Sequence, residues 1–190
     1  MARSGRRPGP TRTKEAILSA ARAQFAQRGY AATTVRSVAA AAGVNPALVH
    51  HHFGRKEQLF LAALALPVNP AEVIGQLLAE GPRAEFPDRL VRYFVGAWRD
   101  PVIGLALQAV LRRAVSDPGS AALLRNLAEN VLLDRAAVLL GVPQLRIAAA
   151  MSHLIGLALA ATVVRIEPLA SASDDELIGL VAPAIRGYLN

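Results

Sequence analysis

The stretch from Thr33 to Phe53, TTVRSVAAAAGVNPALVHHHF, most constrains the fold, because it holds two short helix signals on either side of Gly43. Ala39 lies four residues before this glycine and Val49 lies six residues after it. Two helices that cross steeply need a small residue at their closest approach, a turn residue that tolerates positive φ, and branched apolar residues that fix the angle. The stretch therefore predicts a helix-turn-helix.

Charge is distributed unevenly along the sequence. Residues 1–64 hold ten Lys or Arg against two Glu, whereas residues 65–190 hold eleven Arg against twelve Asp or Glu. The whole net charge of +7 therefore lies in the first third, together with the helix-turn-helix. Because the second helix of such a unit enters the DNA major groove, we expect a nucleic-acid partner, with an anionic membrane surface as the second candidate.

Cap and turn residues predict helices along the rest of the chain, and no segment has the alternation of a strand. The acidic run Asp174–Glu176, after Ser171 and Ser173, suits the positive end of a last helix and is expected to be a capping feature. We expect an all-α fold of about ten helices. The first three have the expected boundaries Thr11 or Thr13 to Gly29, Thr33 or Thr34 to Gly43, and Asn45 with Pro46 onwards. The others are expected over residues 55–66, 70–80, 86–98, 101–115, 119–140, 144–165 and 174–189.

The three consecutive histidines, His50 to His52, would suit a metal ion only if their rings converged. Successive residues on a helix turn by about 100°, so the three rings point in different directions. His153 is the other histidine of the sequence, and the chain has no cysteine. We therefore expect no metal site, no cofactor and no disulfide. The sequence also lacks a Gly-rich phosphate loop and a GxSxG motif, so we expect no enzyme.

Eighteen residues from Ile147 to Val164 carry no formal charge, which is close to the shortest length that spans a membrane. Ser152 and His153 interrupt this segment. A helix that is apolar all round can instead be buried between subunits. Since the N-terminal residues also lack the apolar stretch of a secretory signal, we expect a cytoplasmic protein without a membrane partner.

From about Thr11 to Leu64 the sequence resembles the DNA-binding domain of TetR-type transcriptional regulators. The resemblance rests on the first-helix stripe that ends in FAQRGYAATTV, on the VAAAAGV turn, and on HF followed by RKEQL. More weakly, RAVSDP and VVRIEPLASAS resemble the C-terminal domain of one branch of this family. The resemblance implies a three-helix DNA-reading head over residues 11–66 and a larger helical ligand-binding and dimerisation domain over residues 67–190. Residues 1–10 are expected to be a flexible basic arm.

The family's reading helix carries a Ser, Thr or Asn at its start, a Thr and a Tyr in its middle, and then His-Phe. This sequence has Asn45, Leu48, His50, His52 and Phe53 at those places. Leu48 and His50 depart from the pattern: the leucine could press on a thymine methyl group, and the histidine would make a phosphate contact sensitive to pH. His52 and Phe53 are expected to close the packing of the head.

Further DNA contacts are expected at two other helix starts. Thr33 and Thr34 begin the second helix, where free N–H groups suit a phosphate, and Arg36 lies one turn further on. Lys56 resembles the phosphate-binding lysine of the family. The arginines of residues 1–10 either enter a minor groove or remain free. The expected DNA-binding residues are Thr33, Thr34, Arg36, Asn45, Pro46, Ala47, Leu48, His50, His51 and Lys56.

For the larger domain, the resemblance implies an apolar or amphipathic small-molecule effector and a four-helix dimer interface. Aromatic residues at helical spacing are candidates for an effector cavity, although the same spacing also suits plain core. The expected pocket residues are Tyr93, Phe94, Trp98, Gln108, Leu111, Arg112 and Met151. The expected interface, on the helices over residues 119–140 and 144–165, contains Leu124, Val131, Leu154, Gly156, Leu157 and Ala160.

Two classes of function fit these features. The first is a homodimeric, ligand-responsive transcriptional regulator, most simply a repressor, which binds a palindromic double-stranded DNA operator. The second is a non-specific architectural DNA-binding protein, or a protein of anionic membrane surfaces, that uses the same basic face. A footprint confined to an inverted repeat would support the first class, and uniform affinity for random sequences would support the second.

Overall fold

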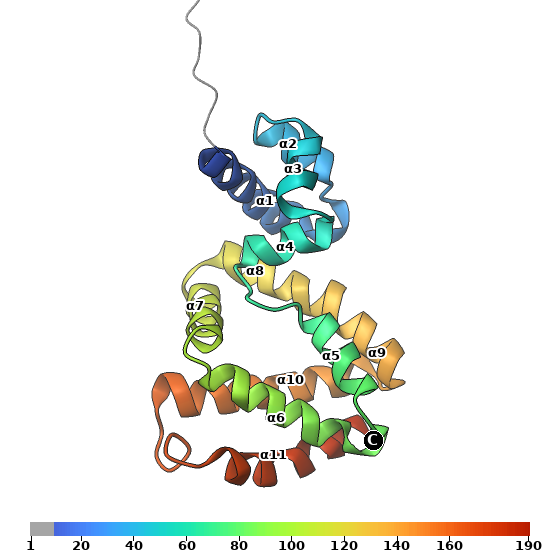
Figure 1. Cartoon of the computed structure of the whole chain (residues 1–190), viewed down its shortest axis with the longest axis vertical. Helices are drawn as coiled ribbons and strands as arrows, with labels where there is room; N and C mark the ends of the chain where they lie inside the picture. Colours follow the sequence, from blue (N-terminus) through green and yellow to red (C-terminus); the bar gives the residue numbers. More distant parts are fainter. Residues whose placement is uncertain (1–9) are drawn as a thin grey trace, which may run out of the picture. The chain divides into compact units, whose positions relative to one another are not determined.

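The computed structural model describes residues 10–190, and the expected basic arm, with Arg3, Arg6 and Arg7, falls almost entirely outside the described residues. Over the described range the fold is all-α, as predicted (Figure 1). Within this range its eleven labelled α-helices form ten continuous segments, because α8 and α9 are joined without a break. Contacts divide the chain into two compact units. Of the described residues, the first unit contains 10–66 together with 114–126, and the second contains 67–113 and 127–190.

The first unit consists of four consecutive helices and a later one. They are α1 (Pro10–Ala32), α2 (Val35–Ala41), α3 (Pro46–Phe53), α4 (Lys56–Leu64) and α8 (Pro118–Leu127). The predicted apolar stripe of α1 lies inside, with Ile17, Ala21 and Phe25 fully buried. Phe25 meets Phe60 of α4 edge to face at a ring distance of 4.7 Å. These rings form the centre of the first unit's core.

Residues 114–126 join the first unit, which the sequence did not predict. Gly29, the expected end of α1, has φ 77° and interrupts the helical backbone, and one more turn follows to Ala32. At this break Asn126 of α8 accepts a hydrogen bond from the backbone N–H of Tyr30 at 3.2 Å. A polar side chain from a distant helix therefore satisfies a backbone group that the irregular turn leaves open.

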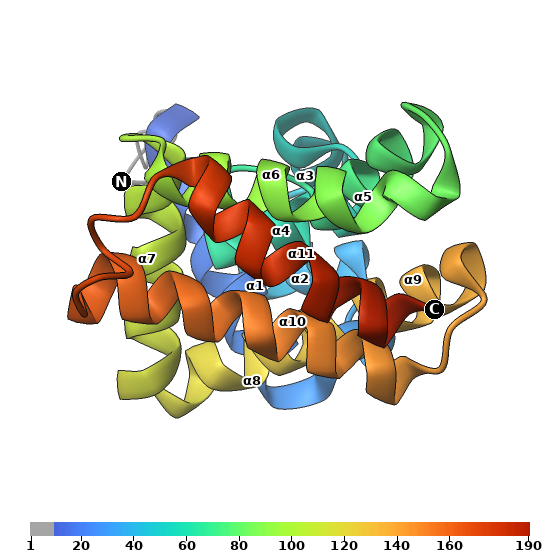
Figure 2. The same cartoon turned by 90° about the horizontal axis from the view of Figure 1, so that it is seen from below.

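The second unit is built on α6 (Phe86–Arg99), α10 (Gln144–Ala158) and α11 (Asp174–Leu189), which lie side by side (Figure 2). Their shared core includes Val91, Leu154 and Ile185. The other helices of the unit are α5 (Pro70–Ala79), α7 (Ile103–Ser116, which continues into the first unit), and α9 (Asp134–Leu140), with a 3-10 turn at Arg83–Glu85.

Two helices that were expected to be regular contain wider turns. Residues Ala128–Leu133 and Leu159–Val164 are π-helical, and the first connects α8 to α9 while the second extends α10. The helix over residues 144–164 is long and apolar enough to cross a membrane, but most of it is not buried inside the protomer. The sequence predicts that a second protomer covers this partly exposed apolar helix.

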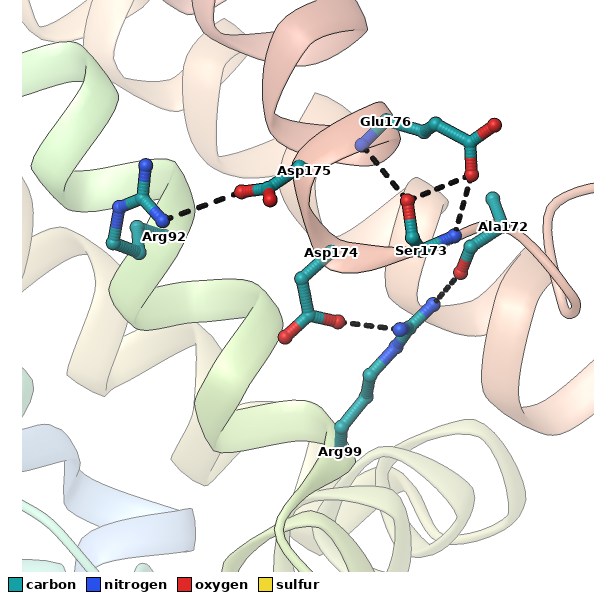
Figure 3. Close-up of polar contacts among 7 residues, drawn as sticks. All are labelled: Arg92, Arg99, Ala172, Ser173, Asp174, Asp175 and Glu176. Atoms are coloured by element: carbon teal, nitrogen blue, oxygen red, sulfur yellow. Dashed lines mark hydrogen bonds and ion pairs between the residues drawn. The ribbon is translucent and has the colours of Figure 1, made fainter.

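Polar contacts hold the start of α11 against α6 (Figure 3). Ser173 caps α11, and the Glu176 carboxylate accepts hydrogen bonds from the Ser173 N–H at 2.8 Å and hydroxyl at 2.7 Å. These bonds lower the pKa of the Glu176 carboxyl. Arg99 of α6 pairs with Asp174 and also donates to the Ala172 carbonyl. The prediction that the acidic run is a capping feature is confirmed.

Ser173→Ala should lower the free energy of unfolding by about 1 kcal/mol, because it removes a helix cap. The matched control is Ser171→Ala, since the Ser171 hydroxyl is exposed and donates only to the nearby Pro168 carbonyl at 3.2 Å. Stability that depends on an ionised Glu176 is present at neutral pH and is lost as the pH falls through its lowered pKa. The difference between wild type and Ser173→Ala in urea unfolding should therefore narrow in acid. Equal losses for both variants at neutral pH would contradict this account of the cap.

Candidate nucleic-acid interface

The helix-turn-helix is formed by α2, the turn at Gly43, and α3, as predicted. Gly43 has φ 66°, a conformation that favours glycine. Val38 and Ala39 of α2 and Val49 of α3 have no exposed surface. The small and branched residues thus lie between the two helices and fix the angle at which α3 leaves the turn.

The two threonines before α2 have different environments. Thr34 is exposed and caps the helix, and its hydroxyl accepts from the Ser37 N–H at 3.0 Å. The Thr33 side chain is 0% exposed, and its hydroxyl donates to the carbonyls of Gly29 at 2.8 Å and Gln24 at 3.2 Å. The Thr33 hydroxyl therefore points into the head, and the phosphate contact expected at the free N–H groups of this helix start stays a prediction.

Gln24 on α1 positions α2, although the sequence analysis did not single it out. Its amide donates to the Ser37 carbonyl at 2.8 Å, and its side-chain oxygen accepts from the Ser37 hydroxyl at 2.6 Å. Because Ser37 also bonds to Thr34, the start of α2 is tied to the middle of α1 by a continuous polar network. The sequence contained one signal for this role, because Gln24 directly precedes Phe25 of the apolar stripe in an alanine-rich helix.

Most of the residues at the start and along α3 that were expected to face DNA are exposed. Asn45 caps the helix, and its side-chain oxygen accepts from the Ala47 N–H at 2.9 Å, which leaves its amide NH₂ free to donate. Leu48 is 41% exposed although it is a large apolar residue. Ala47, His50 and His51 are also exposed, whereas Pro46 is half-buried.

The end of α3 is tied to the turn that follows it. Gly54 donates its N–H to the His50 carbonyl at 2.8 Å, and the His50 ring Nδ1 lies 3.0 Å from the Gly54 carbonyl. Phe53 is buried and His52 is half-buried, so these two residues pack in the head as predicted. The His50 ring is therefore exposed, and its Nδ1 lies within hydrogen-bond distance of the Gly54 carbonyl.

Lys56 lies at the start of α4 and is held by the end of α1. Its ammonium lies 4.3 Å from the centre of the Tyr30 ring and donates to the Ala31 carbonyl at 3.3 Å. Partial burial lowers the pKa of Lys56. Arg36 on α2 is exposed, as is Arg55, whose N–H donates to the Gln58 side chain at 2.9 Å. Near the starts of α2 and α4 the first unit thus has one cation, Lys56, that is held by α1, and two exposed arginines, Arg36 and Arg55.

The expected pocket residues lie in the second unit and are partly brought together. Trp98 is buried and lies 5.8 Å from the Phe94 ring, while Tyr93, Phe94 and Met151 pack against one apolar core. Burial raises the pKa of the Tyr93 hydroxyl. Gln108 and Leu111 are half-buried on α7, but Arg112 is exposed, so its predicted place in a cavity wall is not supported.

The expected interface residues fall into two groups. Val131 is 7% exposed and Leu154 is 5% exposed, so both belong to the interior of the protomer and are corrected. The others keep exposed surface: Leu124, Leu157 and Ala160 are half-buried, and Gly156 is exposed. On the neighbouring α11, Leu180 is 72% exposed, which was not predicted from the sequence.

Comparisons with known proteins find one family over both parts of the chain. Residues 17–63 match the family described as bacterial regulatory proteins of the tetR family, and residues 84–189 match the tetracyclin repressor-like C-terminal domain. An HTH-type transcriptional repressor of Mycobacterium tuberculosis is 38% identical over 130 residues, which are 60% of this chain and 69% of that protein. The repressor AcnR of Corynebacterium glutamicum is 47% identical over 53 residues, 28% of each chain. A TetR-family regulator from Streptomyces coelicolor is 36% identical, with 98% of this chain and 99% of that chain covered and a TM-score of 0.44.

Proposed function

Because this chain belongs to the TetR family of transcriptional regulators, we propose that it is a ligand-responsive repressor that binds a palindromic operator as a homodimer. A regulator of this family binds DNA and is not an enzyme. The observation that carries the proposal is the exposed face of α3, where Leu48, His50 and His51 lie beside buried Val49. The relative from Mycobacterium tuberculosis is named a repressor, which supports repression over activation.

The first unit would make two kinds of DNA contact, one to phosphates and one to bases. Lys56, Arg36 and the N-terminus of α2 at Thr34 offer positive charge or free N–H groups, which suit phosphates and set the position of the protein. Asn45 and Leu48 offer an amide donor and an apolar surface, which suit base edges and a thymine methyl group. Sequence preference should therefore depend on α3, and affinity on the surrounding cations.

The proposed effector site lies in the second unit, beside the aromatic side chains of α6. Tyr93 and Phe94 are half-buried and Met151 packs against the same core, so this region combines apolar surface with one hydroxyl. Such a lining suits an apolar or amphipathic small molecule. The effector would change operator affinity by favouring one spacing of the two reading heads over another.

The proposed dimer face lies on α10 and α11. Most of the apolar helix over residues 144–164 is not buried inside the protomer, and Gly156 and Ala160 would let a second helix approach closely. The adjacent α11 adds exposed Leu180. Two such helix pairs around a two-fold axis would form a four-helix interface and would match the symmetry of a palindromic operator.

The division of DNA contacts predicts different effects for three substitutions. Lys56→Ala should weaken binding to all sequences about tenfold and reduce the salt slope by about one per protomer. Leu48→Ala should chiefly blur sequence preference, as should Asn45→Ser, which keeps a capping oxygen for α3. Binding would be measured by fluorescence anisotropy on an inverted repeat selected from a random pool and on a mixed-sequence duplex, over a range of salt.

Arg83→Ala is the charge-matched control, since Arg83 is an exposed arginine of the second unit. Its affinity and salt slope should equal those of wild type. Equal losses for Lys56→Ala, Leu48→Ala and Asn45→Ser on both duplexes would contradict the assigned roles. Selection of no preferred sequence, or binding to anionic vesicles as tight as to DNA, would instead support the non-specific alternative.

A further inference from the structure

His50 and Gly54 are joined by two hydrogen bonds in opposite directions. The Gly54 N–H donates to the His50 carbonyl at 2.8 Å, and the His50 ring Nδ1 lies 3.0 Å from the Gly54 carbonyl. Gly54 has φ 70°, and a Cβ there would lie 2.1 Å from the Gln58 Oε1. The same Oε1 accepts from the Arg55 N–H, so the turn that presents the Gly54 carbonyl is fixed on both sides.

This arrangement determines which ring nitrogen of His50 carries a proton. A carbonyl oxygen only accepts hydrogen bonds, so Nδ1 must be the donor and holds the proton of the neutral ring. The outward Nε2 of the neutral ring then has a lone pair and no hydrogen. A phosphate oxygen is also an acceptor, so neutral His50 cannot bond to it. Only the imidazolium carries N–H on both nitrogens. It alone can donate to a phosphate from Nε2 while Nδ1 keeps its hydrogen bond to the Gly54 carbonyl.

The charged and titratable groups on α3 and on the helices packed against it are mostly cations. His51 and His52 share its helix, and Lys14 of α1 lies 5.9 Å from the centre of the Phe53 ring. The helices packed against α3 add Arg36 from α2, and Arg55, Lys56 and Glu57 at the start of α4. Cations outnumber the carboxylates in this set, and a DNA phosphate would supply a negative charge beside an imidazolium.

We infer that His50 contacts an operator phosphate only as an imidazolium, so that each protomer takes up a proton when it binds DNA. The inference rests on the proposed DNA-binding function and adds a dependence on pH to it. Because the complex holds more protons than the free protein and free DNA, affinity must rise as the pH falls. Histidine is the side chain whose charge changes between about pH 5 and 8, so the effect falls in a physiological range.

The test measures operator affinity as a function of pH and salt, with the inverted repeat that the protein selects from a random duplex pool. Affinity should rise at least tenfold between pH 8 and pH 6, the size of about one charge-assisted hydrogen bond. The imidazolium adds one phosphate neutralisation per protomer, so the slope of log affinity against log salt should be steeper at pH 6 by about 0.9 per protomer. A purely structural role of His50 would leave that slope unchanged.

Substitutions separate His50 from other titrating groups. In His50→Gln and His50→Tyr the side chain keeps a donor that does not titrate in this range, so both the rise in affinity and the change in salt slope should disappear. His51→Gln should keep both, whatever it does to affinity. Nitrogen-15 NMR of the free protein should find the neutral His50 ring protonated on Nδ1.

The possible contrary results are distinct. A pH profile unchanged by His50→Gln would overturn the inference, and so would a neutral ring protonated on Nε2. Affinity that falls on acidification would mean that neutral Nε2 accepts from a base amine, which also overturns it. Failure to select any sequence would overturn the proposed function alone, because a pH series on a mixed-sequence duplex still tests the phosphate contact.

Discussion

Phe25→Ala should lower the free energy of unfolding of the first unit by about 3–5 kcal/mol, since it empties the centre of that unit's core. Phe25 has no exposed surface, meets Phe60 at a ring distance of 4.7 Å and stacks on Tyr30 at 6.0 Å. A domain of this size has a total stability of only about 5–15 kcal/mol. The variant should therefore lose operator binding at 37 °C although no DNA contact has been changed.

Urea unfolding followed by circular dichroism would measure this loss. Phe25→Leu, which keeps most of the buried volume, should lose much less stability, and Val115→Ala should lose almost none because Val115 is 89% exposed. Added DNA should restore part of the folded population of Phe25→Ala, since a ligand that binds only the native state stabilises it. Full stability in Phe25→Ala would mean that α8 and the other helices hold the first unit without its aromatic centre.

The helix-turn-helix was predictable from sequence because its determinants are local. A capping threonine, a turn glycine with positive φ, and a proline after an asparagine cap each act within a few residues of their own position. Which of Thr33 and Thr34 caps α2 could not be decided from neighbouring residues. Either threonine can cap a helix, and only the carbonyls of Gly29 and Gln24 decide that the Thr33 hydroxyl turns inward.

The larger domain was less predictable, because long stretches of its helices hold only aliphatic residues that do not mark an outward face. Val131 and Leu154 look like their neighbours in sequence, and only the packing of α10 against α6 and α11 shows that Leu154 is core. Exposed Leu180 was missed for the same reason, since it is one of many aliphatic residues on α11. The π-helical turns also lack a sequence signal, as they use the same residue types as regular helix.

Gly156→Arg should abolish dimer formation and reduce operator affinity roughly 100-fold or more, because the two half-sites would no longer be bound by one linked molecule. The substitution suits this test. Gly156 is exposed, and a Cβ there meets nothing within 4 Å, so the protomer has room for the new side chain. Arginine is also a better helix former than glycine by about 0.8 kcal/mol. The folded protomer should therefore be at least as stable as before.

The dimer should not tolerate this substitution. Two arginines near a two-fold axis would place two like, unpaired charges in an apolar interface. Sedimentation velocity should find monomers of Gly156→Arg and dimers of the control Gly96→Arg, which makes the same change at an exposed, open position of α6. A dimeric, fully DNA-competent Gly156→Arg would move the interface elsewhere, and the apolar surface of α10 would need a different partner. A monomer that still bound one half-site weakly would show that the reading head folds and works without its partner, and that the two-fold axis supplies the affinity.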